Sequence, residues 1–318
     1  MSCVSIAACG GGGRGGNGDG LSMELSDLNL STDQLGAEDS PYMRLLAKAT
    51  PCAFYNVPND APEVRATALG DASDPNTAYR AEMQDVSVIR SPFGPNDDRI
   101  LAAVFDGHGG ADGSRLAAEF VVDAIHQEIG TRDPKEIMED AFTASDLVFE
   151  RDDVMFQGTT ALVVVLEKLG DIRLLHLANV GDSRALLVST SSPPMILHPL
   201  HTPDNPAEVE RITTAGGFVA RGKVNGMISV TRSLGNCPMK QVVLSDPFVT
   251  TVTLTGSETW LVLACDGVYD VLQPEAVAAL VSNHQTAQAA AEAVVKEAIA
   301  LSSTDNVSVV VVSLAPEI

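Results

Sequence analysis

Basic residues are scarce in this chain. Its 318 residues include 20 Lys and Arg against 42 Asp and Glu, which gives a formal net charge of −22. A protein with so little positive charge is poorly suited to bind a phosphate backbone or an anionic lipid surface. We therefore expect no nucleic acid and no membrane as partners, and a generally acidic surface on which part of the charge is concentrated locally.

Paired cysteines and long hydrophobic runs are absent too. The five cysteines, at positions 3, 9, 52, 237 and 265, show no paired spacing, which favours a reducing compartment over a disulfide framework. No apolar stretch approaches the ~20 residues that span a bilayer. The N-terminus lacks the basic start and apolar core of a signal peptide, and Ser at position 2 excludes N-myristoylation. We expect a cytoplasmic monomer, with the nucleus as the alternative location.

The beginning of the chain differs in composition from the rest. Residues 10–20 form an interrupted glycine tract, so we expect residues 1–40 to be disordered. Four prolines between positions 51 and 75 exclude long regular elements, so we expect residues 41–70 to be an irregular lead-in. Residues 71–318 are long enough to bury a large core, and we expect them to form one folded domain.

Both helical and strand periodicities occur in the folded part. We expect helices at 113–129, 134–149, 206–214, 275–281 and 287–300, and strands at 160–166, 172–178, 184–188, 260–265 and 307–314. The turn at Leu169-Gly170-Asp171 predicts an antiparallel hairpin. Helices that fall in pairs and strands that form meanders differ from the alternation typical of a parallel α/β sheet.

The stretch from Leu101 to Gly110 is the first that suggests a functional site. A buried strand ends at Asp106, and Gly107, His108 and two further glycines follow before a helical pattern begins. The glycines let the backbone turn tightly or approach a ligand closely. Asp106 offers the oxygen that a hard cation requires, and an imidazole is suited to move protons. Taken alone, the stretch also fits an ordinary polar turn.

The same pattern recurs at three other strands. The strand at 260–265 leads into Asp266 and then Asp270, the strand at 174–180 leads into Gly181-Asp182, and Asp305-Asn306 precedes the strand at 307–312. One Asp at a strand end is typical of a helix cap or a turn. Four of them, each beside Gly or Asn, predict a shared oxygen-rich metal site.

A series of short blocks runs from about Ala78 to Leu314. It includes Arg80-Ala-Glu-Met-Gln-Asp85, Val104-Phe-Asp-Gly-His-Gly-Gly110, Gly158-Thr-Thr-Ala161, Asn179-Val-Gly-Asp-Ser-Arg184, Val230-Thr-Arg-Ser-Leu-Gly235, Ala264-Cys-Asp-Gly-Val-Tyr-Asp270 and Ser303-Thr-Asp-Asn306. In this order the blocks resemble the type 2C metal-dependent Ser/Thr protein phosphatases. The resemblance implies an α+β fold, a four-layer α/β/β/α sandwich of two antiparallel sheets flanked by helix pairs, and makes 71–318 a catalytic domain.

The resemblance also implies a metal site. Two ions, Mg²⁺ or Mn²⁺, would be held by Asp106, the Gly107 carbonyl, Asp266 and Asp305, with Asp106 bridging both ions. Asp182 and Asp270 match a weaker third metal site.

Further residues match positions that act on the substrate, a phosphoprotein. Asp85 would order metal-bound waters, His108 would be the general acid, and Arg80 would grip the phosphate. Thr160 matches a position near the metal waters, and a plain core-strand role is the equal alternative. Residues 201–240 match the flap that borders the cleft.

Several positions depart from the family pattern. Gln84 stands where a carboxylate is usual, Leu200 and Asn236 stand where Asp is usual, and Tyr269 replaces a Trp. We assign Leu200 and Asn236 to packing of the flap and expect Gln84 alone to touch the chemistry. Two interpretations stay open: an active phosphatase, and a catalytically impaired pseudophosphatase that acts as a regulatory binding protein. The intact aspartates and His108 favour the active enzyme.

Overall fold

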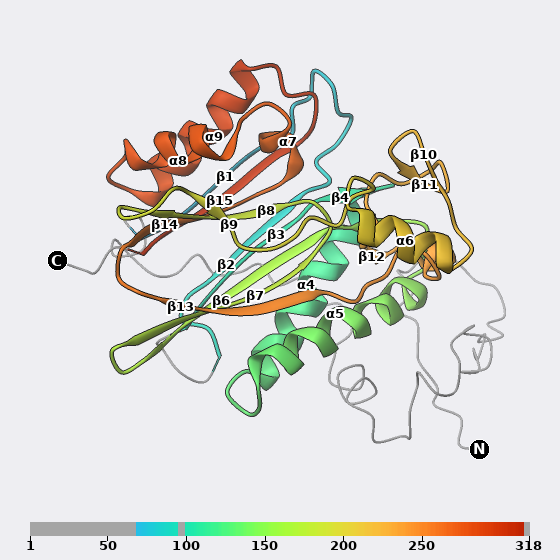
Figure 1. The fold of residues 1–318 in the computed structure, drawn as a ribbon, viewed down its shortest axis with the longest axis horizontal. Helices are drawn as coiled ribbons and strands as arrows, with labels where there is room; N and C mark the ends of the chain where they lie inside the picture. Colours follow the sequence, from blue (N-terminus) through green and yellow to red (C-terminus); the bar gives the residue numbers. More distant parts are fainter. Residues whose placement is uncertain (1–67, 95–98, 315–318) are drawn as a thin grey trace, which may run out of the picture. The chain divides into compact units, whose positions relative to one another are not determined.

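Figure 1 shows the computed structural model, which describes residues 68–94 and 99–314. The predicted disordered segment 1–40, and the predicted lead-in 41–70 up to residue 67, lie outside the described residues. The first strand, β1, begins at Leu69, close to the predicted start of the folded domain at residue 71.

Two antiparallel sheets of five strands each form the centre of the fold. The first sheet has the order β1 (Leu69–Asp74), β15 (Val307–Ser313), β14 (Glu258–Ala264), β8 (Arg184–Ser189) and β9 (Met195–Ile196). The second has the order β13 (Phe248–Leu254), β7 (Ile172–Val180), β6 (Ala161–Leu169), β3 (Arg99–Phe105) and β2 (Val86–Arg90). The predicted hairpin is the β6–β7 pair, in which Leu169 lies opposite Ile172.

Both faces of the central strands are buried, which explains their continuous apolar sequences. In β6, Leu162 and Val164 belong to the core between the sheets, and the intervening Val163 is equally buried on the opposite face. In β14, Leu261 points into the same core, whereas Val262 belongs to a second core on the outer face. A strand with only one covered face would alternate with polar residues instead.

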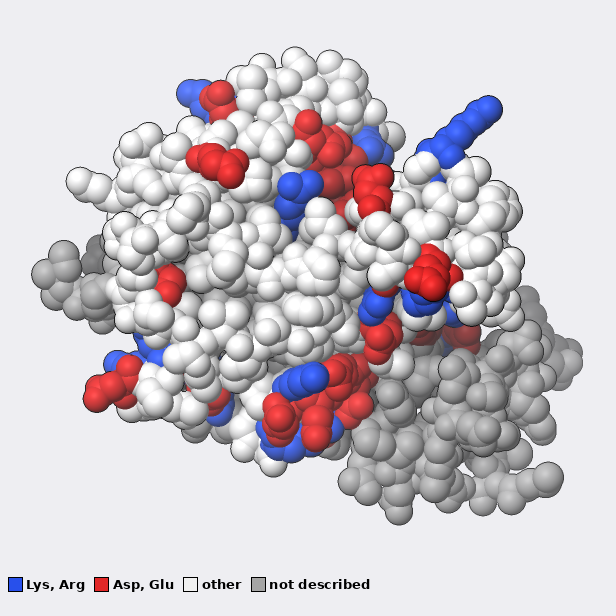
Figure 2. All heavy atoms as spheres, viewed as in Figure 1, with Lys and Arg blue, Asp and Glu red and all other residues white. Residues whose placement is uncertain are grey.

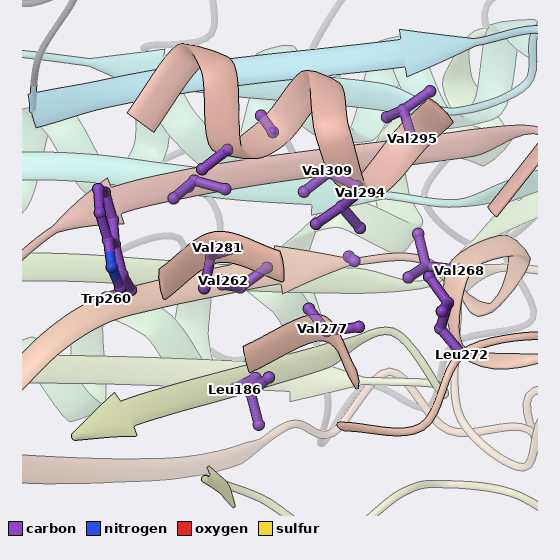
Figure 3. Packing of buried hydrophobic residues seen from close by; sticks show 14 of the residues in the cluster. Leu186, Trp260, Val262, Val268, Leu272, Val277, Val281, Val294, Val295 and Val309 are labelled. Carbon is purple, nitrogen blue, oxygen red and sulfur yellow. The ribbon is translucent and has the colours of Figure 1, made fainter. Parts of the chain in front are cut away.

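Helices cover the outer face of each sheet. The helices α8 (Pro274–Ser282) and α9 (Ala287–Ala300) pack on the first sheet, and Figure 3 shows Val277 and Val294 of these helices directed towards its strands. The helices α4 (Ala111–Glu128) and α5 (Pro134–Arg151) pack together against the second sheet. These layers are visible in Figure 1. The predicted four-layer α/β/β/α sandwich is confirmed.

Local signals set the helix starts. Asp133 caps α5 by accepting a hydrogen bond from the Lys135 amide at 2.9 Å, and Pro134 occupies the first turn. Thr286 caps α9 in the same way, accepting from the Ala289 amide at 3.2 Å. No helix among residues 68–94 and 99–314 is both long and apolar enough to cross a membrane.

A small three-stranded sheet lies where the strands of the second sheet end. Its order is β12 (Leu234–Gly235), β5 (Gly158–Thr159) and β4 (Gly107–His108), with β5 in the middle. Each of these strands has only two residues, so hydrophobic periodicity cannot reveal them. This sheet brings the segment after Asp106 next to residues of the predicted flap.

Candidate metal centre

Three aspartates converge at one end of the sandwich. Asp106 follows β3, Asp182 lies in the turn after β7, and Asp266 follows β14 as the first residue of the short helix α7 (Asp266–Tyr269). One carboxylate oxygen from each lies within 4.8 Å of those of the other two. Because β3 and β7 belong to the second sheet and β14 to the first, the cluster joins the two sheets.

Asp85 and Cys265 extend the cluster into the core. Their ligand atoms and a carboxylate oxygen of Asp106 also lie within 4.8 Å of one another. Cys265 is fully buried; its Sγ lies 3.5 Å from the Asn306 carbonyl oxygen and accepts from the Ser308 amide at 3.2 Å. Burial raises the pKa of its thiol well above the usual value, so Cys265 stays protonated. A thiol that is fully buried and protonated serves as a packing residue.

The electrostatics of the cluster favour a bound cation. Burial, followed by the charges of neighbouring aspartates, raises the pKa of Asp266 to about 6 and that of Asp182 to about 7. Burial also raises the pKa of Asp85 to about 6 and that of Asp106 well above its ordinary value. Carboxylates this close cannot all ionise without a compensating positive charge. Figure 2 shows acidic side chains gathered beside α7.

Unpartnered oxygens point to the same conclusion. Oδ2 of Asp85 and Oδ1 of Asp266 are buried, and neither has a hydrogen-bond partner among the described residues. A buried carboxylate oxygen without a partner is costly unless a cation meets it. An all-carboxylate donor set suits Mg²⁺ or Mn²⁺. The aspartates therefore fit the hard divalent ions that the sequence predicted.

Asp305 lies at the edge of the cluster, where its charge raises the pKa of Asp266. Its Oδ1 accepts from the Asn306 amide at 2.7 Å, and its Oδ2 forms an ion pair with Arg80. Asp270 is exposed, and its charge adds to the raised pKa of Asp182. The predicted ligands Asp305 and Asp270 are thus near the cluster without belonging to the three-aspartate group.

Two residues beside the predicted ligands hold the backbone of the site. Thr160 donates its amide to the Asp106 carbonyl oxygen at 2.9 Å, and its Oγ1 accepts the Asp106 amide at 3.1 Å. Asn306 accepts the Gln84 amide at 2.9 Å and donates to the Pro75 and Glu82 carbonyl oxygens. Thr160 therefore positions Asp106. The sequence reasoning named Asn306 only as part of a motif and missed its contacts.

The backbone of Gln84 also lies beside the site. Its carbonyl oxygen accepts from the Gly107 amide at 3.2 Å and from Ser114 Oγ at 2.5 Å. A Cβ at position 107 would lie 2.4 Å from that oxygen, so only glycine fits there. The Gln84 side chain donates through Nε2 to Glu82 Oε1 at 2.9 Å.

Comparisons with known proteins agree with this geometry. The model of the protein phosphatase 2C family matches residues 70–307. The chain belongs to the protein phosphatase 2C family. The enzyme class predicted from the sequence, a Ser/Thr protein phosphatase, is thereby confirmed.

Two curated relatives and two solved structures illustrate the likeness. The chain is 34% identical over 262 residues to protein phosphatase 2C homolog 1 of Saccharomyces cerevisiae, an alignment that covers 77% of this chain and 93% of that protein. It is 35% identical over 255 residues to human protein phosphatase 1F, covering 75% of this chain and 55% of the relative. This chain therefore spans almost all of the yeast relative and about half of the human one.

Among solved structures, a sex-determining protein from C. elegans shares 28% identity with a TM-score of 0.69, covering 79% of this chain and 65% of that one. A serine-threonine phosphatase 2C from Toxoplasma gondii shares the fold, with a TM-score of 0.66 and 21% identity over 78% of this chain and 95% of that one.

One residue of this phosphatase 2C chain makes a contact that the sequence did not suggest. Asn236, which we placed in flap packing, lies against the predicted general acid, with its Oδ1 2.8 Å from Nε2 of His108. Burial lowers the pKa of His108, although the hydrogen bond to Asn236 acts in the opposite direction. Asn236 is therefore a second departure from the family pattern that lies beside a residue with a predicted catalytic role.

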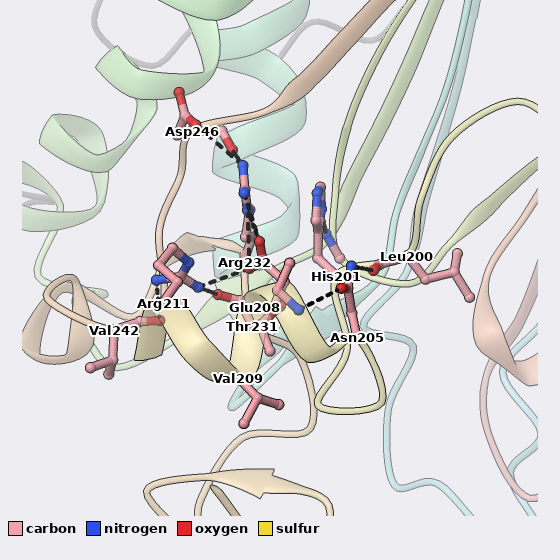
Figure 4. Close-up of polar contacts among 12 residues, drawn as sticks. Leu200, His201, Asn205, Glu208, Val209, Arg211, Thr231, Arg232, Val242 and Asp246 are labelled. Carbon is pink, nitrogen blue, oxygen red and sulfur yellow. Dashed lines mark hydrogen bonds and ion pairs between the residues drawn. The ribbon is translucent and has the colours of Figure 1, made fainter. Parts of the chain in front are cut away.

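The predicted flap contains a helix, a β-hairpin and a polar cluster at its base. The helix α6 (Pro206–Thr214) matches its prediction, and β10 (Val219–Ala220) pairs with β11 (Lys223–Val224). Figure 4 shows Glu208 of α6 between Arg211 and Arg232. Burial alone would raise the pKa of Glu208, but the hydrogen bonds from these two arginines lower it to about 2.

The Leu200 side chain points away from this polar cluster in Figure 4, and its carbonyl oxygen accepts from Asn205 Nδ2 at 3.4 Å. A cavity of about 370 Å³ lies beside the cluster, lined by Lys135, His201, Glu208, Arg232 and Phe248 among others. None of the clustered aspartates lines it, so this cavity is separate from the metal site.

We expect Glu208→Gln to destabilise the fold by about 1–2 kcal/mol. The change leaves two guanidinium groups facing a neutral amide, and a fully buried pair would lose ~3–5 kcal/mol. The smaller value follows because the Arg211 and Arg232 side chains are 23% and 18% exposed. Urea unfolding measures the effect. The matched control is Asp112→Asn, which removes one partner of the exposed Asp112–Arg115 pair and should lower the free energy of unfolding by less than ~0.5 kcal/mol. Equal losses in the two variants would contradict the prediction.

Proposed function

We propose that this chain hydrolyses phosphoserine and phosphothreonine in protein substrates, using water activated by two divalent ions, Mg²⁺ or Mn²⁺. The observation that carries the proposal is the convergence of Asp106, Asp182 and Asp266 within 4.8 Å, together with the unpartnered buried oxygens. Phosphate monoesters hydrolyse extremely slowly without a catalyst, so a site must supply both a nucleophile and positive charge. The aspartates would hold the ions, which would supply a bound water of lowered pKa and positive charge beside the phosphoryl oxygens.

The proposal assigns a role to each aspartate of the site. Asp106 would bridge the two ions, with Asp266 and Asp305 holding one and the Gly107 carbonyl the other. Asp106 suits a central place among the ligands because a carboxylate oxygen of it lies within 4.8 Å of those of both Asp182 and Asp266. Asp182, with Asp270 nearby, would hold a weaker third ion. Asp85 is buried next to Asp106 and would accept hydrogen bonds from ordered water.

Arg80 and His108 would handle the substrate. The Arg80 side chain is 45% exposed and pairs with Asp305 at the rim of the cluster. Its planar guanidinium can present two donors to a phosphate while it stays next to this carboxylate. His108 would give a proton to the leaving oxygen of serine or threonine, which departs poorly as an alkoxide. The pseudophosphatase alternative is not favoured, because the chain keeps the aspartates and both of these side chains at the positions that match the family pattern.

The test is phosphate release from phosphothreonine peptides by the purified full-length chain. We expect turnover in Mn²⁺ or Mg²⁺ and none in excess EDTA, with recovery when metal is restored. Turnover that is equal with and without the chelator would show that no metal is needed. A folded protein that is inert at every metal concentration would instead support the pseudophosphatase.

Gln84→Glu should shift the metal titration of activity to lower concentration, by ~10-fold, with a smaller change in maximal turnover. A carboxylate is usual at this position in the family, and it would add negative charge to a segment whose backbone contacts Gly107, a predicted ligand. Groups next to metal ligands commonly alter affinity or activity ~10–100-fold.

Gln84→Ala should shift the same titration towards higher metal concentration, because it removes an acceptor and adds no charge. Initial rates across a Mn²⁺ series give the titration curves of the wild type, Gln84→Glu and Gln84→Ala. Superimposed curves would place the side chain of residue 84 beyond the reach of metal-bound water.

A further inference from the structure

The side chains of His108 and Asn236 meet across a glycine. In the small sheet, His108 of β4 is paired with Gly158 of the central strand β5, and Gly158 is paired on its other side with Gly235 of β12. A Cβ on Gly158 would lie 2.1 Å from Asn236 Oδ1 and 2.6 Å from His108 Nε2. The missing side chain in the central strand therefore leaves the space in which the two outer side chains make contact.

The position of Asn236 is fixed from several directions. Its backbone adopts the left-handed conformation, with φ of 53°, which Asn tolerates better than most residues. Its amide donates to the Gln157 carbonyl oxygen at 2.8 Å, and the residue is 4% exposed. Ser233 Oγ donates to Asn236 Oδ1 at 2.7 Å. The side-chain oxygen is thus held where His108 Nε2 meets it.

The chemistry of an amide decides what this contact does. The oxygen of a side-chain amide only accepts hydrogen bonds, so Nε2 of His108 must carry a proton at 2.8 Å from Asn236 Oδ1. In a neutral ring the proton is then absent from Nδ1. Since Nε2 is engaged, any proton exchanged with substrate passes through Nδ1.

We propose that Asn236 is a positioning residue for the reaction: it accepts the Nε2–H of His108 and holds the ring in one orientation with Nδ1 free. The protonated ring then gives its Nδ1 proton to the leaving oxygen and is left as the neutral Nε2–H tautomer. This inference rests on the proposed function for its catalytic part. The part that concerns the tautomer stands on the contacts alone. An Asp at position 236, which is usual in the family, would accept the same Nε2–H, so Asn236→Asp is the conservative variant.

The first experiment is a long-range ¹H–¹⁵N spectrum of the histidine-labelled, metal-free full-length chain at pH 8. We expect His108 to be in the Nε2–H tautomer in the wild type and in Asn236→Asp. In Asn236→Leu, which has no acceptor, we expect a mixture of tautomers. A wild-type His108 with its proton on Nδ1 would mean that the amide nitrogen of Asn236 faces the ring, and it would overturn the proposal whether or not the protein is active.

The second experiment compares two substrates. Asn236→Leu should lower kcat on a phosphothreonine peptide ~10–100-fold with little change in KM, because a misplaced acid loses most of its contribution. It should lower kcat on an aryl phosphate only a few-fold, because that leaving group departs without a proton. Asn236→Asp should recover most of the loss, and Ser233→Ala should show a smaller loss of the same kind.

The matched control is Asn225→Leu. Asn225 is also left-handed, with φ of 49°, and its Oδ1 accepts from the Phe218 amide within the flap, without contact to His108. The replacement introduces the same backbone strain, and we expect it to leave the ratio of the two kcat values unchanged. Equal losses on both substrates in Asn236→Leu, or a changed ratio in Asn225→Leu, would overturn the positioning role. A wild type inactive on both substrates would refute the proposed function and leave the spectrum to test the tautomer.

Discussion

Asp106→Asn should reduce kcat/KM on a phosphothreonine peptide by at least ~10³-fold, which corresponds to about 4 kcal/mol of transition-state stabilisation. Asp106 is the one residue shared by both groups of close ligand atoms. The amide keeps the shape of the side chain and removes a charge that metal ions require. Steady-state rates in saturating Mn²⁺ measure the loss.

The fold should survive this replacement. In the absence of metal, Asp106 is disfavoured as an anion, since burial and the charges of Asp266 and Asp85 raise its pKa well above the ordinary value. A neutral amide removes that repulsion, so in EDTA the variant should be at least as stable to heat as the wild type. Asp112→Asn, which changes an exposed acid on α4, is the matched control and should keep full activity. More than a tenth of wild-type activity in Asp106→Asn would contradict the role of the cluster.

Mn²⁺ should stabilise the chain strongly at pH 8 and weakly at pH 5. Asp85 and Asp266 have pKa values raised to about 6, and Asp182 has one raised to about 7. Groups whose pKa rises on folding contribute stability that is present below about pH 4 and is lost as the pH rises through 6 and 7. A bound cation offsets the charge that causes this loss, and at pH 5 it must displace protons first.

The measurement is the difference in melting temperature between Mn²⁺ and EDTA across pH 5 to 8. A ligand present at a hundred times its Kd adds ~2.7 kcal/mol for each site. Burial lowers the pKa of His198 to about 4 and that of His201 to about 3, so their stabilisation is lost as the pH falls below about 6.5. Because this loss of stability occurs both with and without metal, it cancels in the difference between the two melting temperatures. A metal-induced shift that is the same at pH 5 and pH 8 would contradict the prediction.

Features that depend on neighbours along the chain could be predicted from the sequence. The apolar runs predicted the interior strands of both sheets, because these are buried on two faces and so lack polar alternation. The edge strands β1, β2, β9 and β13 are partly exposed and were not predicted. The prolines and capping residues at the starts of α5 and α6 placed these helices closely. The aspartates at strand ends predicted the metal site, since carboxylates beside Gly or Asn recur at each of the strands that meet there.

Contacts between distant segments could not be predicted in this way. His108 and Asn236 are 128 positions apart and are joined by strands of two residues, which have no periodic signal. The strands β7 and β8 follow each other in the chain yet lie in different sheets, because the chain crosses between the sheets near Gly181. The Arg80–Asp305 ion pair links two blocks whose roles the family resemblance treated separately.

A calorimetric titration of the full-length chain with Mn²⁺ at pH 7.5, run in parallel on Asp106→Asn, tests the central claim most directly. If the aspartate cluster is the metal centre, the wild type should bind two ions tightly. Asp106→Asn should then lose at least one of these ions and bind any other much more weakly. Unchanged stoichiometry and affinity in Asp106→Asn would show that the metal binds elsewhere and would contradict the account.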